Sequence, residues 1–242
     1  MDYTALITGA SKRIGKAIAE FLAGKGWNIV IHFNDSEEPA KELQSALREK
    51  YPQQKFVRIK ADLSVEGEVE QLTSRVVDEI GGFNLLVNNA SVFSSGYLKE
   101  TDLSLFDMQM NVNLKAPFLL MRDFATHCKK GNIVNFVDTR IATNKSNYAA
   151  YSLSKKGLWE LTKMAALEFA PEIRVNAIAP GVTLPPEDKG QNYLLNLAKN
   201  IPMKRPGGLE PILKSLDFIL ENDHLTGQLL FADGGENLGM NL

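Results

Sequence analysis

The sequence predicts an α/β protein built on a single doubly wound parallel sheet with helices on both faces. Short apolar runs alternate with longer, helix-like segments through the 242 residues. Strict alternation of strand and helix requires crossover connections, which make neighbouring strands parallel and cover both faces of the sheet. No internal repeat or low-complexity linker divides the chain. We therefore expect residues 1–242 to form one domain.

The expected strands are short apolar runs, and the expected helices are longer segments with apolar residues at intervals of three and four. The strands are Tyr3–Ile7, Ile29–Phe33, Phe56–Ile59, Leu85–Val87, Ile133–Val137, Ile173–Ile178 and Leu229–Phe231. The helices are Ile14–Leu22, Ser36–Tyr51, Val65–Ile80, Leu103–Cys128 and Ala150–Phe169. The stretch from Pro180 to Gly208 carries five prolines. We expect a substrate lid at about 181–208, because periodic structure resumes directly after it.

Composition limits the classes of partner. Apolar residues make up 44% of the chain and the net charge is −2, which gives no general attraction to nucleic acid or anionic lipid. No apolar run approaches the roughly 18 residues of a membrane span. The one cysteine, Cys128, excludes an internal disulfide and favours a reducing compartment. We expect a cytoplasmic protein whose partner is a small molecule, with no nucleic acid and no membrane. His32, His127 and His224 lack metal-ligand spacing, so no metal is expected.

A glycine-containing turn joins the first strand to the first helix. The strand stops at Thr8-Gly9, and Ala10-Ser11-Lys12-Arg13-Ile14-Gly15 leads into the helix. The carboxyl end of a parallel strand beside a helix N-terminus offers free backbone N–H groups and a favourable dipole to a pyrophosphate. Gly9 permits a tight turn, and Gly15 permits close packing of the helix on the strand. The three-glycine dinucleotide fingerprint is incomplete, so an ordinary strand-to-helix turn is the alternative for this segment alone.

Three further motifs follow in order along the chain. Asn88-Asn89-Ala90-Ser91 comes after the fourth strand, Tyr151-Ser152-Leu153-Ser154-Lys155 opens a helix, and Pro180-Gly181 comes after the sixth strand. Together with the turn at Gly9, this combination resembles the short-chain dehydrogenase/reductase family over nearly the whole chain. The resemblance implies a Rossmann fold, a nicotinamide cofactor, and a homotetramer assembled through Leu103–Cys128 and Ala150–Phe169.

The resemblance also implies which residues hold the cofactor. They lie in the first turn, at the ends of the second and third strands, in the Asn-Asn-Ala segment, at the Tyr-x-x-x-Lys motif and after the sixth strand. The set is Gly9, Lys12, Arg13, Ile14, Gly15, Ser36, Asp62, Leu63, Asn89, Ala90, Tyr151, Lys155, Pro180, Gly181 and Thr183. For Asp62 the alternative is a helix-capping or loop residue.

Tyr151 and Lys155 form the expected reaction centre. Four residues apart on a helix, they share one face and lie about 6 Å apart along its axis. A nearby ammonium favours the tyrosinate, so we expect Lys155 to lower the pKa of the Tyr151 phenol. Tyr151 then donates a proton to the group that receives hydride, and Lys155 also binds the cofactor ribose. Asn113 resembles the family's asparagine that anchors a water near the lysine, and Asn111 is the competing candidate.

Asp138 departs from the family pattern. Most members carry a serine there, about thirteen residues before the tyrosine, which donates a hydrogen bond to a substrate carbonyl. An ionised carboxylate repels a developing alkoxide. It suits a substrate with ring N–H or amino groups, and burial can raise its pKa until it acts as an acid. In the alternative interpretation, Thr139 takes the serine's role and Asp138 only caps a loop.

Arg13 and Phe93 are further distinctive residues. Arg13 stands where the family usually has its middle glycine, and Ser91-Val92-Phe93 follows Asn-Asn-Ala directly. With Asp138 before Tyr151, these residues resemble the pteridine reductases within the family. That resemblance implies a substrate site of Arg13, Ser91, Phe93, Asp138 and Tyr151, in which the phenylalanine stacks on the pterin ring and the aspartate and tyrosine deliver protons. The alternative for Phe93 is a place in the core.

The choice of nicotinamide cofactor depends on the end of the second strand. An acidic residue there selects the ribose hydroxyls of NAD, whereas a cation selects the phosphate of NADP. Asp35 favours NADH. Lys12 and Arg13, with Ser36 as a possible phosphate ligand, favour NADPH. We expect NADPH.

These inferences lead to one main functional hypothesis and two alternatives. The main one is an NADPH-dependent reductase that transfers hydride to the C=N bond of a dihydropterin-like substrate, as a pteridine, dihydrofolate or dihydromonapterin reductase does. The first alternative is a carbonyl reductase of the same family, such as a 3-oxoacyl thioester reductase. The second is a non-catalytic NADP-binding protein, against which the Tyr151/Lys155 pair argues.

Overall fold

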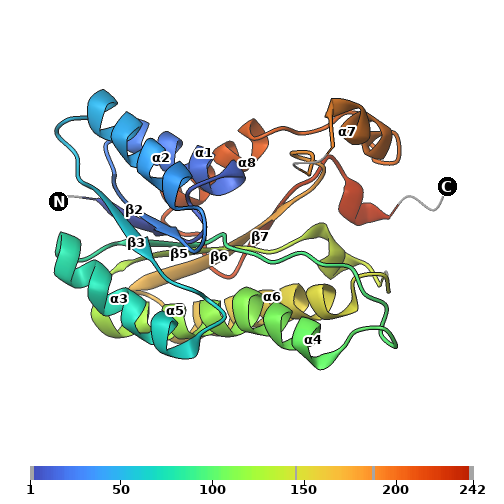
Figure 1. Cartoon of the computed structure of the whole chain (residues 1–242), viewed down its shortest axis with the longest axis horizontal. Coiled ribbons are helices and arrows are strands. Elements are labelled where there is room, and N and C mark those ends of the chain that lie inside the picture. Colours follow the sequence, from blue (N-terminus) through green and yellow to red (C-terminus); the bar gives the residue numbers. More distant parts are fainter. Residues whose placement is uncertain (1–2, 145, 187–188, 240–242) are drawn as a thin grey trace.

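The computed structural model describes residues 3–144, 146–186 and 189–239. Within them, one sheet of seven parallel strands has the order β3-β2-β1-β4-β5-β6-β7 (Figure 1). The strands are β1 (Thr4–Ile7), β2 (Asn28–Phe33), β3 (Phe56–Lys60), β4 (Leu85–Asn88), β5 (Gly131–Phe136), β6 (Ile173–Pro180) and β7 (Leu229–Ala232). The predicted doubly wound parallel sheet is confirmed, and every predicted strand is present.

The direction of winding reverses at β1. This strand pairs with β2 on one side and with β4 on the other, so that Ile7 lies beside both Ile31 and Val87. The chain builds β2 and β3 outward from β1, then returns to add β4 to β7 on the opposite side. In an open parallel sheet, the carboxyl ends of the strands beside such a reversal diverge and leave a crevice for a ligand.

Helices cover both faces of the sheet (Figure 1). One layer is α1 (Arg13–Gly24), α2 (Glu37–Lys50) and α8 (Glu210–Glu221), and the other is α3 (Glu66–Ile80), α5 (Ala116–His127) and α6 (Ala149–Phe169). Successive side chains of a strand point to opposite faces. Ala5 and Ile7 of β1 therefore enter the core under the first layer, and Leu6 enters the core under the second.

The segment predicted as one helix over Leu103–Cys128 is divided. It consists of α4 (Leu103–Met110), a π-helical turn η1 (Asn111–Lys115) and α5. A π turn holds one residue more than an α turn. One extra residue changes the spacing of the apolar side chains too little to be recognised in the sequence. Sequence analysis also missed α8 and α7 (Gln191–Ala198), which lies inside the 181–208 segment. No helix in the described ranges has both the length and the apolar composition needed to cross a bilayer.

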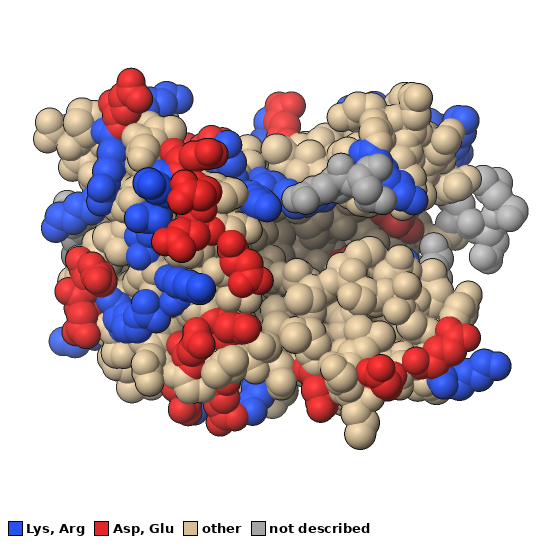
Figure 2. Space-filling model, in the orientation of Figure 1, with Lys and Arg blue, Asp and Glu red and all other residues tan. Residues whose placement is uncertain are grey.

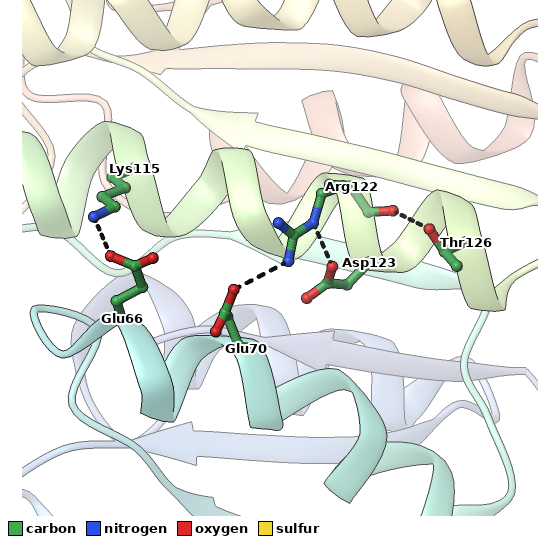
Figure 3. Close-up of polar contacts among 6 residues, drawn as sticks. All are labelled: Glu66, Glu70, Lys115, Arg122, Asp123 and Thr126. Atoms are coloured by element: carbon green, nitrogen blue, oxygen red, sulfur yellow. Dashed lines mark hydrogen bonds and ion pairs between the residues drawn. The ribbon is translucent and has the colours of Figure 1, made fainter.

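Ion pairs on the surface join α3 to α5 (Figure 3). The Lys115 ammonium, at the end of η1, donates to the Glu66 carboxylate. Further along α5, the Arg122 guanidinium lies 3.7 Å from Glu70 and donates to Asp123 at 2.7 Å. Most of these side chains are about half exposed, so water screens the charges and the pairs contribute little to stability. The apolar contacts between the helices and the sheet carry most of the stability.

Candidate active site

Two adjoining cavities open at the carboxyl ends of the strands, next to the reversal at β1. One has a volume of about 660 Å³ and the other a volume of about 770 Å³. Figure 2 shows the hollow between the upper and lower parts of the molecule. The two cavities share four lining residues, namely Arg13, Ile14, Asn89 and Ser91. A ligand in one cavity can therefore lie next to a ligand in the other.

The glycine turn after β1 forms one wall of the first cavity. Gly9 has a φ of +63°, in the left-handed region that favours glycine. A Cβ on Gly15 would lie 2.2 Å from the Gly9 carbonyl oxygen, so no side chain fits between α1 and the turn. Asn89 Nδ2 donates to the carbonyl oxygens of Thr8 at 2.9 Å and Gly9 at 3.2 Å. The N-terminus of α1 has no side-chain cap, which suits it to bind a pyrophosphate.

His32, to which sequence analysis gave no role, fixes the same turn. The Gly9 N–H donates to His32 Nδ1 at 3.0 Å, and His32 Nε2 lies 3.0 Å from the Ala61 carbonyl oxygen. Because Nδ1 accepts a hydrogen bond, Nε2 carries the proton and the ring is neutral. Burial lowers the pKa of His32 to about 4. Its position at the end of β2 was the available signal for a place beside the cleft.

Arg13 also has a left-handed backbone, with a φ of +53°, which is consistent with the glycine that the family usually places there. Its guanidinium donates to the carbonyl oxygens of Pro185 at 2.8 Å and Leu184 at 3.4 Å. The family resemblance predicts that Arg13 contacts the cofactor and the substrate. In the structure the side chain lines both cavities and joins the glycine turn to the 181–208 segment.

Many of the residues expected to hold the cofactor line the first cavity. They are Gly9, Lys12, Arg13, Ile14, Gly15, Ser36, Asp62, Leu63, Asn89 and Ala90. Asp35 lines it as well, beside Ser36. The Asp62 carboxylate accepts the backbone N–H and the hydroxyl of Ser64 at 2.8 and 2.7 Å, and these bonds lower its pKa. Asp62 thus fixes the turn before α3 and also lines the cavity, and its contact with the cofactor stays a prediction.

Asp138 and Tyr151 meet in the second cavity. Tyr151 Oη donates to Asp138 Oδ2 at 2.7 Å, while Asp138 Oδ1 accepts the Arg140 N–H at 2.8 Å. Asp138 thus caps the short helix η2 (Thr139–Ala142) with one oxygen and faces Tyr151 with the other. Thr139 is buried beside it, with its hydroxyl 3.5 Å from Asp138 Oδ1.

The expected lowering of the Tyr151 pKa is wrong in this structure. Burial, followed by the charge and hydrogen bond of Asp138, raises the pKa of Tyr151 well above its usual value. The spacing of Tyr151 and Lys155 predicted their proximity, but it could not reveal that a carboxylate lies closer to the phenol than the ammonium does. Tyr151 is therefore protonated at neutral pH.

Lys155 lies one helical turn after Tyr151 and is 2% exposed. Its Nζ donates to the Phe136 carbonyl oxygen at 2.8 Å and lies 5.9 Å from the centre of the Tyr151 ring. Burial lowers the pKa of Lys155 to about 8, and the Asp138 carboxylate acts in the opposite direction. At neutral pH the ammonium is mostly charged and offsets the charge of Asp138. Pro180, Gly181 and Thr183 line this cavity too.

Asn113 lies behind the site and lines neither cavity. Its Oδ1 accepts the Val92 N–H at 2.9 Å and the Ser91 hydroxyl at 3.1 Å. Its Nδ2 donates to the Val92 carbonyl oxygen at 2.9 Å and to the Ser154 hydroxyl at 3.2 Å. The buried amide thus joins η1 to α6 and to the segment that carries Ser91. Asn113 positions that segment through these direct bonds.

Phe93 is 55% exposed and lines the second cavity with Ser91. The alternative of a place in the core is therefore wrong. The Phe93 ring meets the Tyr151 ring edge to face, with centres 4.7 Å apart. A flat ligand in the cavity can reach both the exposed phenyl ring and the Tyr151 hydroxyl.

Several residues that line the second cavity were not predicted from the sequence. Tyr148 stands three residues before Tyr151, a helical spacing that was an available signal, and Arg140 follows Asp138 by two positions. No sequence pattern connects Leu194 of α7 or Glu236 near the C-terminus with the site. Within the described ranges, no group of three His, Cys, Asp or Glu side chains is arranged to hold a metal ion.

Comparison with known proteins identifies the family. Residues 3–192 match the model of the short chain dehydrogenase family. The chain belongs to this family. It is 32% identical to glucose 1-dehydrogenase 2 of Bacillus subtilis, in a match that covers 97% of this chain and 95% of that protein. It is 29% identical to the 3-oxoacyl-[acyl-carrier-protein] reductase FabG of Staphylococcus epidermidis, over 97% of this chain and 99% of that protein.

Two solved structures share the fold closely. FolM alternative dihydrofolate reductase 1 of Brucella suis, crystallised with NADP, has a TM-score of 0.93 and 34% identity, covering 99% of this chain and 97% of that chain. A blue fluorescent protein from a metagenomic library, crystallised with NADPH, has a TM-score of 0.89 and 26% identity, covering 96% and 97%. The predicted family and Rossmann fold are confirmed, and the likeness to FolM supports the pteridine reductase-like subgroup.

Proposed function

We propose that this short-chain dehydrogenase is an NADPH-dependent reductase of the C=N bond of a dihydropterin-like substrate. The observation that carries the proposal is the 2.7 Å hydrogen bond between Tyr151 and Asp138 inside a cavity that Phe93 also lines. A carboxylate in the position of the usual serine is unfavourable beside a developing alkoxide. It is favourable beside the N–H and amino groups of a nitrogen heterocycle, with which it can form hydrogen bonds.

The first cavity fits a dinucleotide. Gly15 leaves no room for a side chain, the N-terminus of α1 is uncapped, and both features suit a pyrophosphate at the turn. Bound NADPH supplies the hydride. Lys12, Arg13 and Ser36 are the proposed contacts that select the ribose phosphate, although Asp35 lies in the same cavity. Tyr151 and Lys155 line the adjoining second cavity and are the proposed contacts of the nicotinamide end of the cofactor.

The chain's own residues supply the proton. Tyr151 Oη holds it at neutral pH, because burial and Asp138 keep the phenol protonated. As the ring carbon of the C=N bond gains hydride, the ring nitrogen takes the proton from Oη. The Tyr151–Asp138 pair then carries two negative charges, of which the Lys155 ammonium offsets one, and Tyr151 regains a proton from solvent before the next cycle. Phe93 stacks on the flat ring, and Asn113 holds Ser91 in place beside it.

The 181–208 segment is the proposed lid of this single-domain enzyme. Residues of α7 line the second cavity, and Arg13 holds Leu184 and Pro185 at the cleft. We further propose a homotetramer, supported by exposed apolar side chains on α4, α5 and α6. A cytoplasmic location is supported by the single cysteine.

The test measures NADPH oxidation with dihydrobiopterin, dihydrofolate and an acetoacetyl thioester. We expect turnover of at least one dihydropterin, lost in Tyr151→Phe. Asp138→Ser should lose pterin reduction and keep its affinity for NADPH, because Asp138 is not among the proposed cofactor contacts. Preference for the thioester would assign the protein to the carbonyl reductases. NADPH binding without turnover of any of these substrates would favour the non-catalytic alternative.

A further inference from the structure

A stack of planar groups stands beside the reaction centre. The rings of Phe93 and Tyr148 are nearly parallel, with 9° between their planes and 4.4 Å between their centres. The guanidinium carbon of Arg140 lies 4.3 Å from the centre of the Tyr148 ring. Tyr148 therefore contacts an aromatic ring and a cation at once. Neither of these two contacts involves the side chains of Asp138 or Tyr151.

The backbone holds the members of this stack together. The Gly96 N–H donates to the Asn147 carbonyl oxygen at 3.2 Å, and the Ala149 N–H donates to the Gly96 carbonyl oxygen at 3.0 Å. These bonds attach the loop after Phe93 to the residues on both sides of Tyr148. In addition, Arg140 Nη1 donates to Asn147 Oδ1 at 3.2 Å. The loop, the start of α6 and η2 thus meet at Tyr148.

The stack restricts the Phe93 ring without covering it. An exposed phenylalanine samples several rotamers unless a neighbour holds it. Tyr148 packs parallel to the ring and Tyr151 contacts it edge to face, yet the side chain is still 55% exposed. Phe93, Tyr148 and Arg140 all line the second cavity. The stack therefore presents a pre-oriented aromatic surface there.

We propose that Tyr148 is a positioning residue that sets specificity for flat bicyclic rings, by holding Phe93 in the orientation that stacks on the substrate. Arg140 holds Tyr148 in turn. A pre-oriented ring binds a planar heterocycle more tightly, because less freedom is lost on binding. A flexible acyl chain gains nothing from it. This inference rests on the proposed function, and it adds the residues that select the shape of the substrate.

The test compares Tyr148→Leu and Tyr148→Phe in the NADPH-dependent reduction of dihydrobiopterin. Tyr148→Leu should raise KM by about three- to tenfold, the effect of one lost aromatic contact, with kcat and NADPH affinity close to those of the wild type. Tyr148→Phe keeps the ring and should restore the wild-type KM. Tyr97→Leu, which removes an exposed aromatic of the same loop outside the stack, is the matched control.

Three results would overturn the inference: an unchanged KM in Tyr148→Leu, an equal loss of kcat or NADPH affinity, or the same KM increase in Tyr97→Leu. If Tyr148→Leu fails to fold, Arg140→Gln should show a smaller KM increase in the same direction, and an unchanged KM there overturns the inference. If the wild type reduces no pterin, the proposed function fails separately. The stack is then tested by equilibrium dialysis of oxidised biopterin with the NADP-loaded protein, where Tyr148→Leu should weaken binding by the same factor and equal affinity overturns the inference.

Discussion

His32 is neutral in the folded protein because it is buried and its Nδ1 accepts the Gly9 N–H. Its pKa falls from 6.5 to about 4. Between these two pH values the unfolded chain binds more protons than the folded chain, so acidification favours unfolding. The full stability is present above pH 6.5 and decreases as the pH falls toward 4.

We expect this residue to lower the free energy of unfolding by up to about 3 kcal/mol between pH 6.5 and 4. His32→Gln removes the titrating ring, so this part of the pH dependence should disappear. Urea unfolding across that pH range measures the effect. His224→Gln, a change at an exposed histidine, should keep the wild-type slope. The same slope in His32→Gln would contradict the assignment.

At the scale of residues, the sequence predicted which side chains lie together, but it did not predict the direction of the Tyr151 pKa shift. Asp138, Tyr151 and Lys155 line one cavity, as expected. The sign of the Tyr151 pKa shift depended on which way the Asp138 oxygens point, and spacing along a chain does not carry that information. The stack of Phe93 on Tyr148 depends on contact between two segments 55 residues apart, so it too was invisible in the sequence.

At the scale of elements, α1 packs closely on the turn after β1, and Gly15 leaves less space for an added Cβ than any other described glycine. Gly15→Ala should lower the free energy of unfolding by about 1–3 kcal/mol, because the new Cβ meets the Gly9 carbonyl oxygen at 2.2 Å. It should also abolish NADPH binding, since the turn must move. Chemical unfolding and fluorescence titration with NADPH measure the two effects.

A glycine on another helix provides the control. Gly67 lies in the first turn of α3, where an added Cβ meets nothing within 4 Å. Gly67→Ala should stabilise the protein by up to about 1 kcal/mol and leave NADPH binding unchanged. If both variants bind NADPH like the wild type, Gly15 has no part in the cofactor site.

The prediction of one continuous helix over Leu103–Cys128 failed because the segment contains the π turn η1. The apolar pattern of Leu103–Cys128 continues through η1, although the backbone there changes to a π turn. That change carries Asn113 to a position where its amide bonds Val92 and Ser154. α8 was not predicted, although Ile212, Leu216 and Ile219 have helical spacing, because the proline-rich stretch before it interrupts the apolar periodicity.

For the whole molecule, the sequence was sufficient to predict the sheet, its parallel strands and its two helical layers. Alternation of strand and helix leaves few other arrangements. The same alternation does not indicate whether another subunit covers any outer surface. Figure 2 shows an area with few charged residues below the cleft, where Figure 1 places α4 and α6. Leu103, Phe118 and Leu167 are exposed on α4, α5 and α6, and large exposed apolar areas typically mark interfaces.

We expect Phe118→Glu to reduce the oligomeric mass measured by sedimentation, because a buried unpaired carboxylate destabilises an apolar interface. Phe118 is 50% exposed on α5. Phe218→Glu, at a side chain that is 51% exposed on α8 in the opposite layer, is the control and should leave the mass unchanged. A wild-type monomer would contradict the proposed tetramer.

Arg13 connects the glycine turn to carbonyl oxygens at Leu184 and Pro185, so one side chain spans the cleft where its two cavities adjoin. A nucleotide lying along the turn and a substrate in the second cavity would therefore both lie against the Arg13 side chain. The second cavity has its own boundary in α7 and the C-terminal segment. We therefore expect a ligand bound in one cavity to change the affinity of the other cavity for its own ligand.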